Sequence, residues 1–162
     1  MADVSISTPH HQLKAYVATP AGQGPCPGVI VLRDIFGLTG VTCRHADWMA
    51  HDGYLAVARN LFSWGGYIRC IRALMQDLTA RRGPVFDDID AVRQWLTGRP
   101  DCSNKTGIIG FFATGGFAIL LAAGHKGLIG VLGAALGASY KGKDAADARS
   151  RIRTFFAHHL AL

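Results

Sequence analysis

The chain has 162 residues, of which 49% are hydrophobic and only 17% charged, with a formal net charge of +6 and a mean hydropathy of +0.20. This length predicts one domain over residues 1–162, and the basic excess comes without a nucleic-acid-binding motif, which excludes a nucleic-acid partner. The start MADVSISTPHHQ is too polar for a secretory signal. Four scattered cysteines predict reduced thiols in a cytoplasmic protein, with no metal and no cofactor.

The first half of the chain alternates between predicted strands and helices. A half-exposed strand, Leu13–Ala18, precedes the continuous apolar run Gly28–Leu32, which is typical of a strand buried on both faces. A helix then ends at Asp52-Gly53, and Tyr54–Ala58 predicts a second buried strand. The stretch RNLFSWGGYIRC after it is interpreted as a long loop.

The alternation continues in the second half. Helices are predicted for Ile71–Ala80 and for Phe86–Leu96, which presents an apolar face and leaves Asp88 and Arg93 outside. The strand TGIIGF, the helix Gly116–Ala123, the strand LIGVLG and the amphipathic helix SRIRTFFAHHL complete the chain. This pattern predicts an α/β fold: a three-layer α/β/α sandwich with a mostly parallel sheet.

Four stretches in this order resemble the dienelactone hydrolase family of α/β-hydrolases. They are PGVIVLRDIFGL, GYLAVARNLF, DDIDAVRQWLTGRPD and GIIGFFATGGFAILLAA, with a shorter match at Gly137–Asp144. The last of the four is similar to the family's strand, sharp turn and helix that carry the nucleophile. The resemblance implies a site at the carboxyl ends of the strands and a small-molecule ester or lactone as substrate.

The family's site residues are carried over by position. The nucleophile falls on Phe112, the acid that contacts the resting nucleophile on Asp34, and the triad acid on Asp144. The resemblance places the two N–H groups of the oxyanion hole at Ile35 and Ala113. Purely structural roles also stay open for the two acids. Asp34 is suited to cap a turn, and Asp144 is suited to cap the last helix.

The departures from the family concern the chemistry itself. Phe112 has no group that can attack a carbonyl, and the family's glycine two residues later is Thr114, which we expect to cap the helix rather than replace the nucleophile. The triad histidine has no match: His158 and His159 lie on the terminal helix, and His125 ends the helix after the turn. We therefore expect little or no activity, and no rescue by Phe112→Cys alone.

The part of the chain after the turn is also short for this family, which predicts an incomplete α/β-hydrolase fold. Three alternatives stay open beside an inactive hydrolase. The chain is also consistent with a residual esterase that uses an unrecognised nucleophile, and with an interaction or scaffold pseudoenzyme whose exposed strand edge pairs with a partner. The uncharged stretch Thr106–Gly124 is long enough for a membrane helix, although buried elements of an α/β sheet have the same composition. The sequence does not predict the oligomeric state.

Overall fold

The structure is a computed structural model that describes residues 2–22, 24–32, 38–59, 67–111, 114–124, 128–133 and 142–160. The described strands are β1 (Ala2–Ser7), β2 (Gln12–Ala18), β3 (Cys26–Leu32), β4 (Leu55–Arg59), β5 (Cys102–Phe111) and β6 (Leu128–Gly133). The described helices are α1 (Gly40–His51), α2 (Tyr67–Ala80), α3 (Pro84–Thr97), α4 (Thr114–Gly124) and α5 (Gly142–Leu160).

The strands form one sheet in the order β1-β2-β4-β3-β5-β6. β4, β3, β5 and β6 run parallel, while β2 pairs antiparallel with both β1 and β4. β3 lies between β4 and β5 with Ile30 opposite Val57 on one side and Ile108 on the other. β3 and β4 are buried along almost their whole length because helices cover both sides of the sheet.

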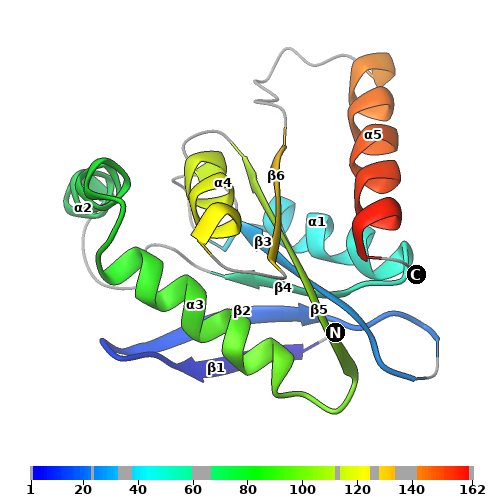
Figure 1. Cartoon of the computed structure of the whole chain (residues 1–162), viewed down its shortest axis with the longest axis horizontal. Coiled ribbons are helices and arrows are strands. Elements are labelled where there is room, and N and C mark those ends of the chain that lie inside the picture. The colour runs from blue at the N-terminus through cyan, green and yellow to red at the C-terminus, as the bar shows by residue number, and fades with distance from the viewer. Residues whose placement is uncertain are drawn as a thin grey trace.

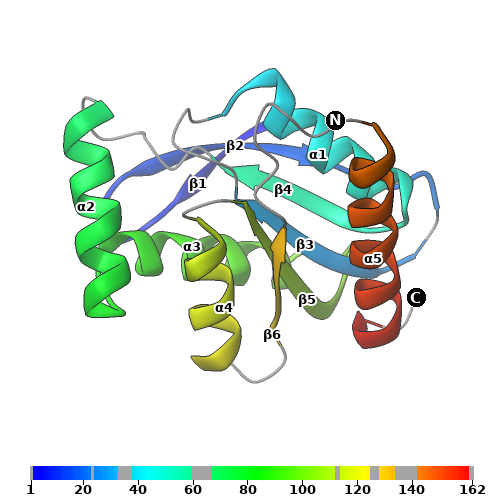
Figure 2. The same cartoon turned by 90° about the horizontal axis from the view of Figure 1, so that it is seen from above.

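The helices form two layers, with α1 and α5 on one face of the sheet and α2, α3 and α4 on the other (Figures 1 and 2). Each face has its own apolar cluster. The α1/α5 face buries Met49, Tyr54 and Phe156 among alanines, while the α2–α4 face buries Leu74 and Phe117 among larger aliphatic residues. The predicted three-layer α/β sandwich with a mostly parallel sheet is therefore confirmed.

Several sequence-based expectations need correction. β1 was not predicted, because its alternation of polar and apolar residues lies in a stretch that looked uniformly polar. α2 begins at Tyr67, inside the expected loop, and α5 begins at Gly142, eight residues before the expected start of the last helix. Asp88 was expected outside α3 but is fully buried, because its carboxylate faces the buried guanidinium of Arg59.

The membrane alternative for Thr106–Gly124 does not match the described structure. Most of this stretch is divided between the end of β5 and the 11-residue helix α4. Within the described ranges, no helix combines the length and the apolar character that crossing a membrane requires.

Candidate functional site

The predicted site residues follow the carboxyl ends of neighbouring parallel strands. β3 ends at Leu32 and β5 at Phe111, and the register pairs Leu32 with Gly110. Asp34, Ile35, Phe112 and Ala113 come directly after these ends but lie outside the described residues. Their predicted roles are therefore untested.

Only the backbone of Asp144, the predicted triad acid, is described. The backbone of Asp144 belongs to the first turn of α5, which begins at Gly142, and its side chain is not among those described. Asp144 is thus inside a helix rather than at its N-cap. Its proposed role as the triad acid is untested as well.

Thr114, the residue in place of a family glycine, joins the ends of two strands. It is fully buried, and its Oγ1 accepts the N–H of Phe111 at 2.9 Å and donates toward the carbonyl oxygens of Leu32 at 3.0 Å and Phe111 at 2.6 Å. The hydroxyl does accept a backbone N–H, as expected, but that group belongs to the end of β5 and not to the helix. A buried oxygen with three backbone neighbours is poorly placed to attack a substrate.

The turn between β5 and α4 also requires a glycine. A Cβ on Gly110 would meet the carbonyl group of Thr114 and the Cα of Gly115, so the start of α4 can approach β5 only because Gly110 has no side chain. The described part of this turn therefore keeps the tight strand-to-helix packing on which a nucleophile turn depends.

His45 is a residue that the sequence analysis did not single out. It lies on α1, and its ring centroid is 4.8 Å from that of Phe111, the last residue of β5, at an interplanar angle of 71°. Its Nδ1 is 2.7 Å from the carbonyl oxygen of Val41, one turn earlier. The sequence does show that His45 lies in the predicted helix after the first buried strand. Its spacing from the other candidate site residues matches no motif, so the sequence alone did not identify it.

Beside His45, the α1/α5 face carries further polar contacts. The hydroxyl of Tyr16 donates to Asp47 at 2.7 Å, and burial together with this hydrogen bond raises the pKa of Tyr16 to about 12. The guanidinium of Arg149 lies 5.6 Å over the ring of Trp48, whose Nε1 is buried without a hydrogen-bond partner. Arg149 thus ties α5 to α1 by a cation–π contact.

A second polar cluster lies at the carboxyl end of β4. Arg59 and Asp88 are both fully buried, with Nη2 and Oδ2 3.4 Å apart, and the Nε2 of His11 is 3.6 Å from the same Oδ2. Burial lowers the pKa of Arg59 to about 10, although the charge of Asp88 opposes that shift. Among the described residues, the Nε and Nη1 of Arg59 have no hydrogen-bond partner, so the ion pair offsets only part of the cost of burying the guanidinium.

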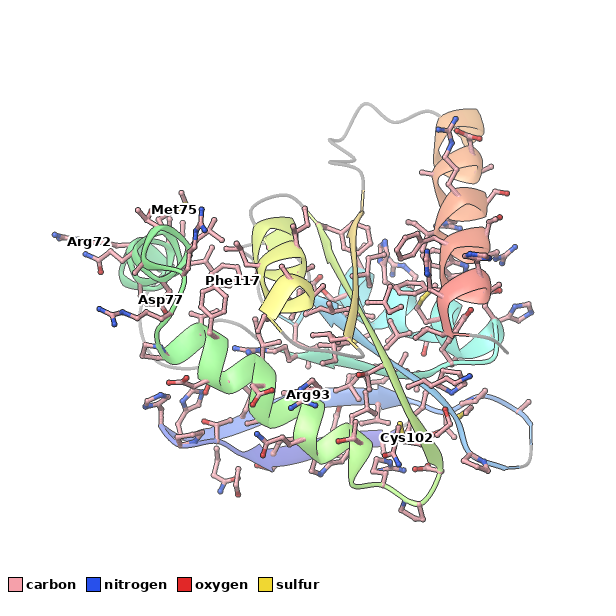
Figure 3. The ribbon with its side chains drawn as sticks, viewed as in Figure 1. Arg72, Met75, Asp77, Arg93, Cys102 and Phe117 are labelled. Atoms are coloured by element: carbon pink, nitrogen blue, oxygen red, sulfur yellow. The ribbon has the colours of Figure 1, made fainter. Side chains whose placement is uncertain are left out.

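A separate pocket lies away from this site. It has a volume of about 530 Å³ and is lined in part by Arg81, Arg82, Phe86, Asp87, Leu120 and Leu121. Figure 3 shows Phe117 between α4 and α2, whereas Arg72 and Met75 project away from the sheet. The pocket is at the far end of α4 from Thr114, so it is not part of the candidate site. The described residues also contain no group of three or more potential metal ligands.

Comparison with known proteins places these features in a family. The model of the dienelactone hydrolase family matches residues 13–159. A putative carboxymethylenebutenolidase of Azospirillum brasilense is 36% identical over 103 residues, which cover 63% of this chain and 45% of that protein. The carboxymethylenebutenolidase of Pseudomonas putida is 25% identical over 122 residues, covering 70% and 51%. The chain therefore spans about half the length of these curated relatives.

Solved structures show the same arrangement. A putative dienelactone hydrolase from Klebsiella pneumoniae subsp. pneumoniae MGH 78578 is similar with a TM-score of 0.64 and 30% identity, over 78% of this chain and 55% of that one. A structure titled m3DLH is similar with a TM-score of 0.68 and 23% identity, over 93% and 74%. The second likeness, at lower identity, concerns the fold alone.

Proposed function

Because the chain belongs to the dienelactone hydrolase family, we propose that it keeps the family's scaffold for an ester or lactone substrate but hydrolyses such bonds poorly or not at all. The observation that carries the proposal is the phenylalanine at position 112, where the family's nucleophile falls. Acyl transfer requires a nucleophile that can add to the carbonyl carbon, and a phenyl ring has none.

One hydrogen bond supports this proposal in two ways. The hydrogen bond from Thr114 to Leu32 joins the residues that flank the segments of Phe112 and Asp34, which favours a common site for the two. The same bond engages the Thr114 hydroxyl, the nearest described candidate for a substitute nucleophile, in a fully buried position. The names of the curated relatives suggest a carboxymethylenebutenolide, an unsaturated lactone, as the first substrate to test.

The test is hydrolysis of this lactone and of p-nitrophenyl acetate by the purified chain and by Phe112→Ala. We expect both proteins to stay at the background rate, because loss of a triad nucleophile lowers turnover by a factor on the order of 10⁶. Clear turnover by the unmodified chain would overturn the proposal. A further loss in Thr114→Val, with Thr114→Ser still active, would then identify Thr114 as the nucleophile of a residual esterase.

An interaction or scaffold role is the second candidate, and the open edge of β6 favours it. Among the described strands, β6 pairs only with β5, and its sequence LIGVLG has no charge or proline to block the addition of a further strand. Thermal shift with the lactone separates the two candidates. A saturable shift supports a substrate site without turnover, whereas its absence supports the scaffold role.

A further inference from the structure

Two cysteines lie side by side at the amino ends of neighbouring parallel strands. Cys26 is the first residue of β3 and Cys102 is the first residue of β5, and their Cα atoms are partners in the register. Both are free thiols. Adjacent strands are about 4.8 Å apart, and a disulfide usually joins Cα atoms about 4.4–6.8 Å apart. The backbone therefore places two thiols within the distance that a disulfide spans.

The pairing of β3 with β5 is irregular at this point. From Cys26 to Gly28, β3 advances by two residues, whereas β5 advances by four, from Cys102 to Thr106. Asn104, within the longer segment, has a left-handed φ of 63°. In a regular parallel pair, opposed Cβ atoms stay about 4.8 Å apart, which exceeds the roughly 3.8 Å that a disulfide prefers. Because the pairing is irregular, Cys102 is not held in that unfavourable geometry.

The two side chains point to the same face of the sheet. A Cβ on Gly28 would be 3.2 Å from the Sγ of Cys102, so this sulfur leans over β3. Cys26 precedes Gly28 by two residues on the same strand, and side chains two apart share a face. Cys26 accordingly packs against the apolar cluster that contains Cys102. Rotation about the two Cα–Cβ bonds is the movement that brings the sulfurs together.

The thiol of Cys26 also contacts the turn that leads into β5. It donates to the carbonyl oxygen of Asp101, the residue before Cys102, at 3.4 Å. The backbone N–H of Cys26 donates to the same oxygen at 3.0 Å. Figure 3 shows Cys102 at the start of β5, the end of that strand opposite to the candidate site. The pair of thiols is thus separate from that site.

Charge and burial set the reactivity of the pair. Burial raises the pKa of both thiols, and the carboxylate of Asp101 raises it further. The Nε and Nη2 of Arg99 donate to that carboxylate at 2.7 Å and 2.6 Å. Since the thiolate is the reactive form, both thiols react slowly at neutral pH and faster as the pH rises. Cys26 is half-buried and Cys102 is buried, so an oxidant reaches Cys26 first.

We propose that Cys26 and Cys102 are a redox-responsive pair, in which a peroxide joins the two thiols in a disulfide and a dithiol reductant restores them. The inference is independent of the proposed function, because neither thiol lies at the carboxyl end of the sheet. The bond joins the first residues of β3 and β5 and closes a loop on the order of 75 residues, which restricts the unfolded chain. Oxidation therefore stabilises the folded chain.

The reaction balances with hydrogen peroxide as the oxidant. The thiolate of Cys26 attacks one peroxide oxygen and the O–O bond breaks, which leaves a sulfenic acid on Cys26 and a hydroxide that is protonated to water. The thiolate of Cys102 then attacks the Cys26 sulfur, so that the S–S bond forms and the S–O bond breaks, with release of a second water. Two thiols and one peroxide give one disulfide and two waters.

Peptide mapping without a reducing agent tests for the bond. The reduced chain is treated with hydrogen peroxide at pH 8.5, where the thiolate fraction of these thiols is about 30-fold larger than at pH 7. The protein is kept dilute, and the remaining thiols are blocked with iodoacetamide before digestion. We expect a linked pair of peptides that contain Cys26 and Cys102, lighter by two hydrogen atoms and separated again by dithiothreitol.

Thermal unfolding measures the effect of the bond on the folded chain. We expect oxidation to raise the unfolding midpoint by at least about 5 °C and dithiothreitol to reverse this shift. Cys26→Ser and Cys102→Ala should each abolish the shift. Cys43→Ser is the matched control, because Cys43 is another half-buried thiol with a raised pKa but lies on α1, across the sheet. This variant should keep the full shift.

A chain in which Cys26 and Cys102 stay unlinked after peroxide treatment would overturn the inference, as would a bond from either of them to Cys43 or Cys70. If Cys102→Ala fails to fold, Cys26→Ser carries the comparison, and a shift of equal size in that variant overturns the inference as well. Lactone hydrolysis is measured separately on the reduced chain. Its result decides the proposed function and leaves the linked peptides unaffected.

Discussion

The two faces of the sheet are closed by different means. On the α1/α5 face, alanines and glycines leave room for aromatic rings, and the polar groups Tyr16 and His45 lie at the margin. On the α2–α4 face, larger aliphatic side chains fill the core, and the Arg59–Asp88 pair is buried at its edge. The polar groups of the α1/α5 face are partly exposed to solvent, whereas the α2–α4 face buries the charges of Arg59 and Asp88 completely.

This difference indicates where each face is sensitive. The aromatic face depends on shape, because its rings fit against small residues with no spare volume. The aliphatic face depends on charge balance, because a buried ion has a large desolvation cost unless its partner remains. We therefore expect the largest loss in the free energy of unfolding when a buried charge loses its partner. A substitution that overfills the aromatic face should cost less, and the loss of one hydrogen bond at the margin should cost least.

The largest effect is expected from Asp88→Ala. This change leaves the guanidinium of Arg59 buried without its carboxylate and should lower the free energy of unfolding by about 3–5 kcal/mol. Urea denaturation followed by circular dichroism measures the loss. The double variant Arg59→Met/Asp88→Leu removes both charges and should regain most of the stability. A double variant as unstable as Asp88→Ala would show that packing, and not charge, controls this face.

An intermediate effect is expected from Gly107→Ala. The new methyl group would lie about 2.5 Å from the Cε1 of Phe156, which is fully buried and cannot move aside freely. We expect a loss of about 1–3 kcal/mol from overpacking. Gly22→Ala is the matched control, because nothing lies within 4 Å of a Cβ there, and it should change stability by less than about 0.5 kcal/mol. Equal effects of the two changes would contradict a shape-limited aromatic face.

The smallest effect is expected from Tyr16→Phe, and it depends on pH. The pKa of Tyr16 is raised to about 12 in the folded chain, from 10.0, so folding favours the protonated phenol. The stabilisation is complete below pH 10 and is lost as the pH rises toward 12. The stability difference between wild type and Tyr16→Phe, on the order of 1 kcal/mol at pH 8, should therefore shrink over this window. A difference that is constant from pH 8 to 11.5 would contradict the shift.

The central elements could be predicted from sequence because their patterns are local. The runs GVIVL and YLAVA are apolar at every position, as strands with helices on both faces must be, and they became β3 and β4. β1 lacks such a run, because its outer edge faces solvent and Asp3 and Ser5 alternate with apolar residues. The start of α5 was missed because GKDA precedes the amphipathic repeat that identified the helix.

The candidate site could be predicted only in part, because its contacts join distant segments. The resemblance to the family gave positions such as Phe112 and Asp34 without any geometry. The contact between His45 and Phe111 joins α1 to β5, and the pairing of Arg59 with Asp88 joins β4 to α3. Helical periodicity also placed Asp88 on the exposed side of α3, which is wrong. Periodicity treats every charged residue as exposed, and it contains no information about the buried Arg59 of β4 that faces Asp88.

The strand order has a consequence for how the chain folds. β1 and β2 are joined by a short turn, so this hairpin can form before most of the chain has been synthesised. β3 can pair with β4 on one side, but its other edge pairs with β5, whose first residue, Cys102, lies opposite Cys26 across several intervening elements. Pairings so distant along the chain slow the search for the native state. During synthesis, one edge of the apolar strand β3 therefore stays unpaired until β5 has left the ribosome, and in that interval the edge is open to non-native pairing.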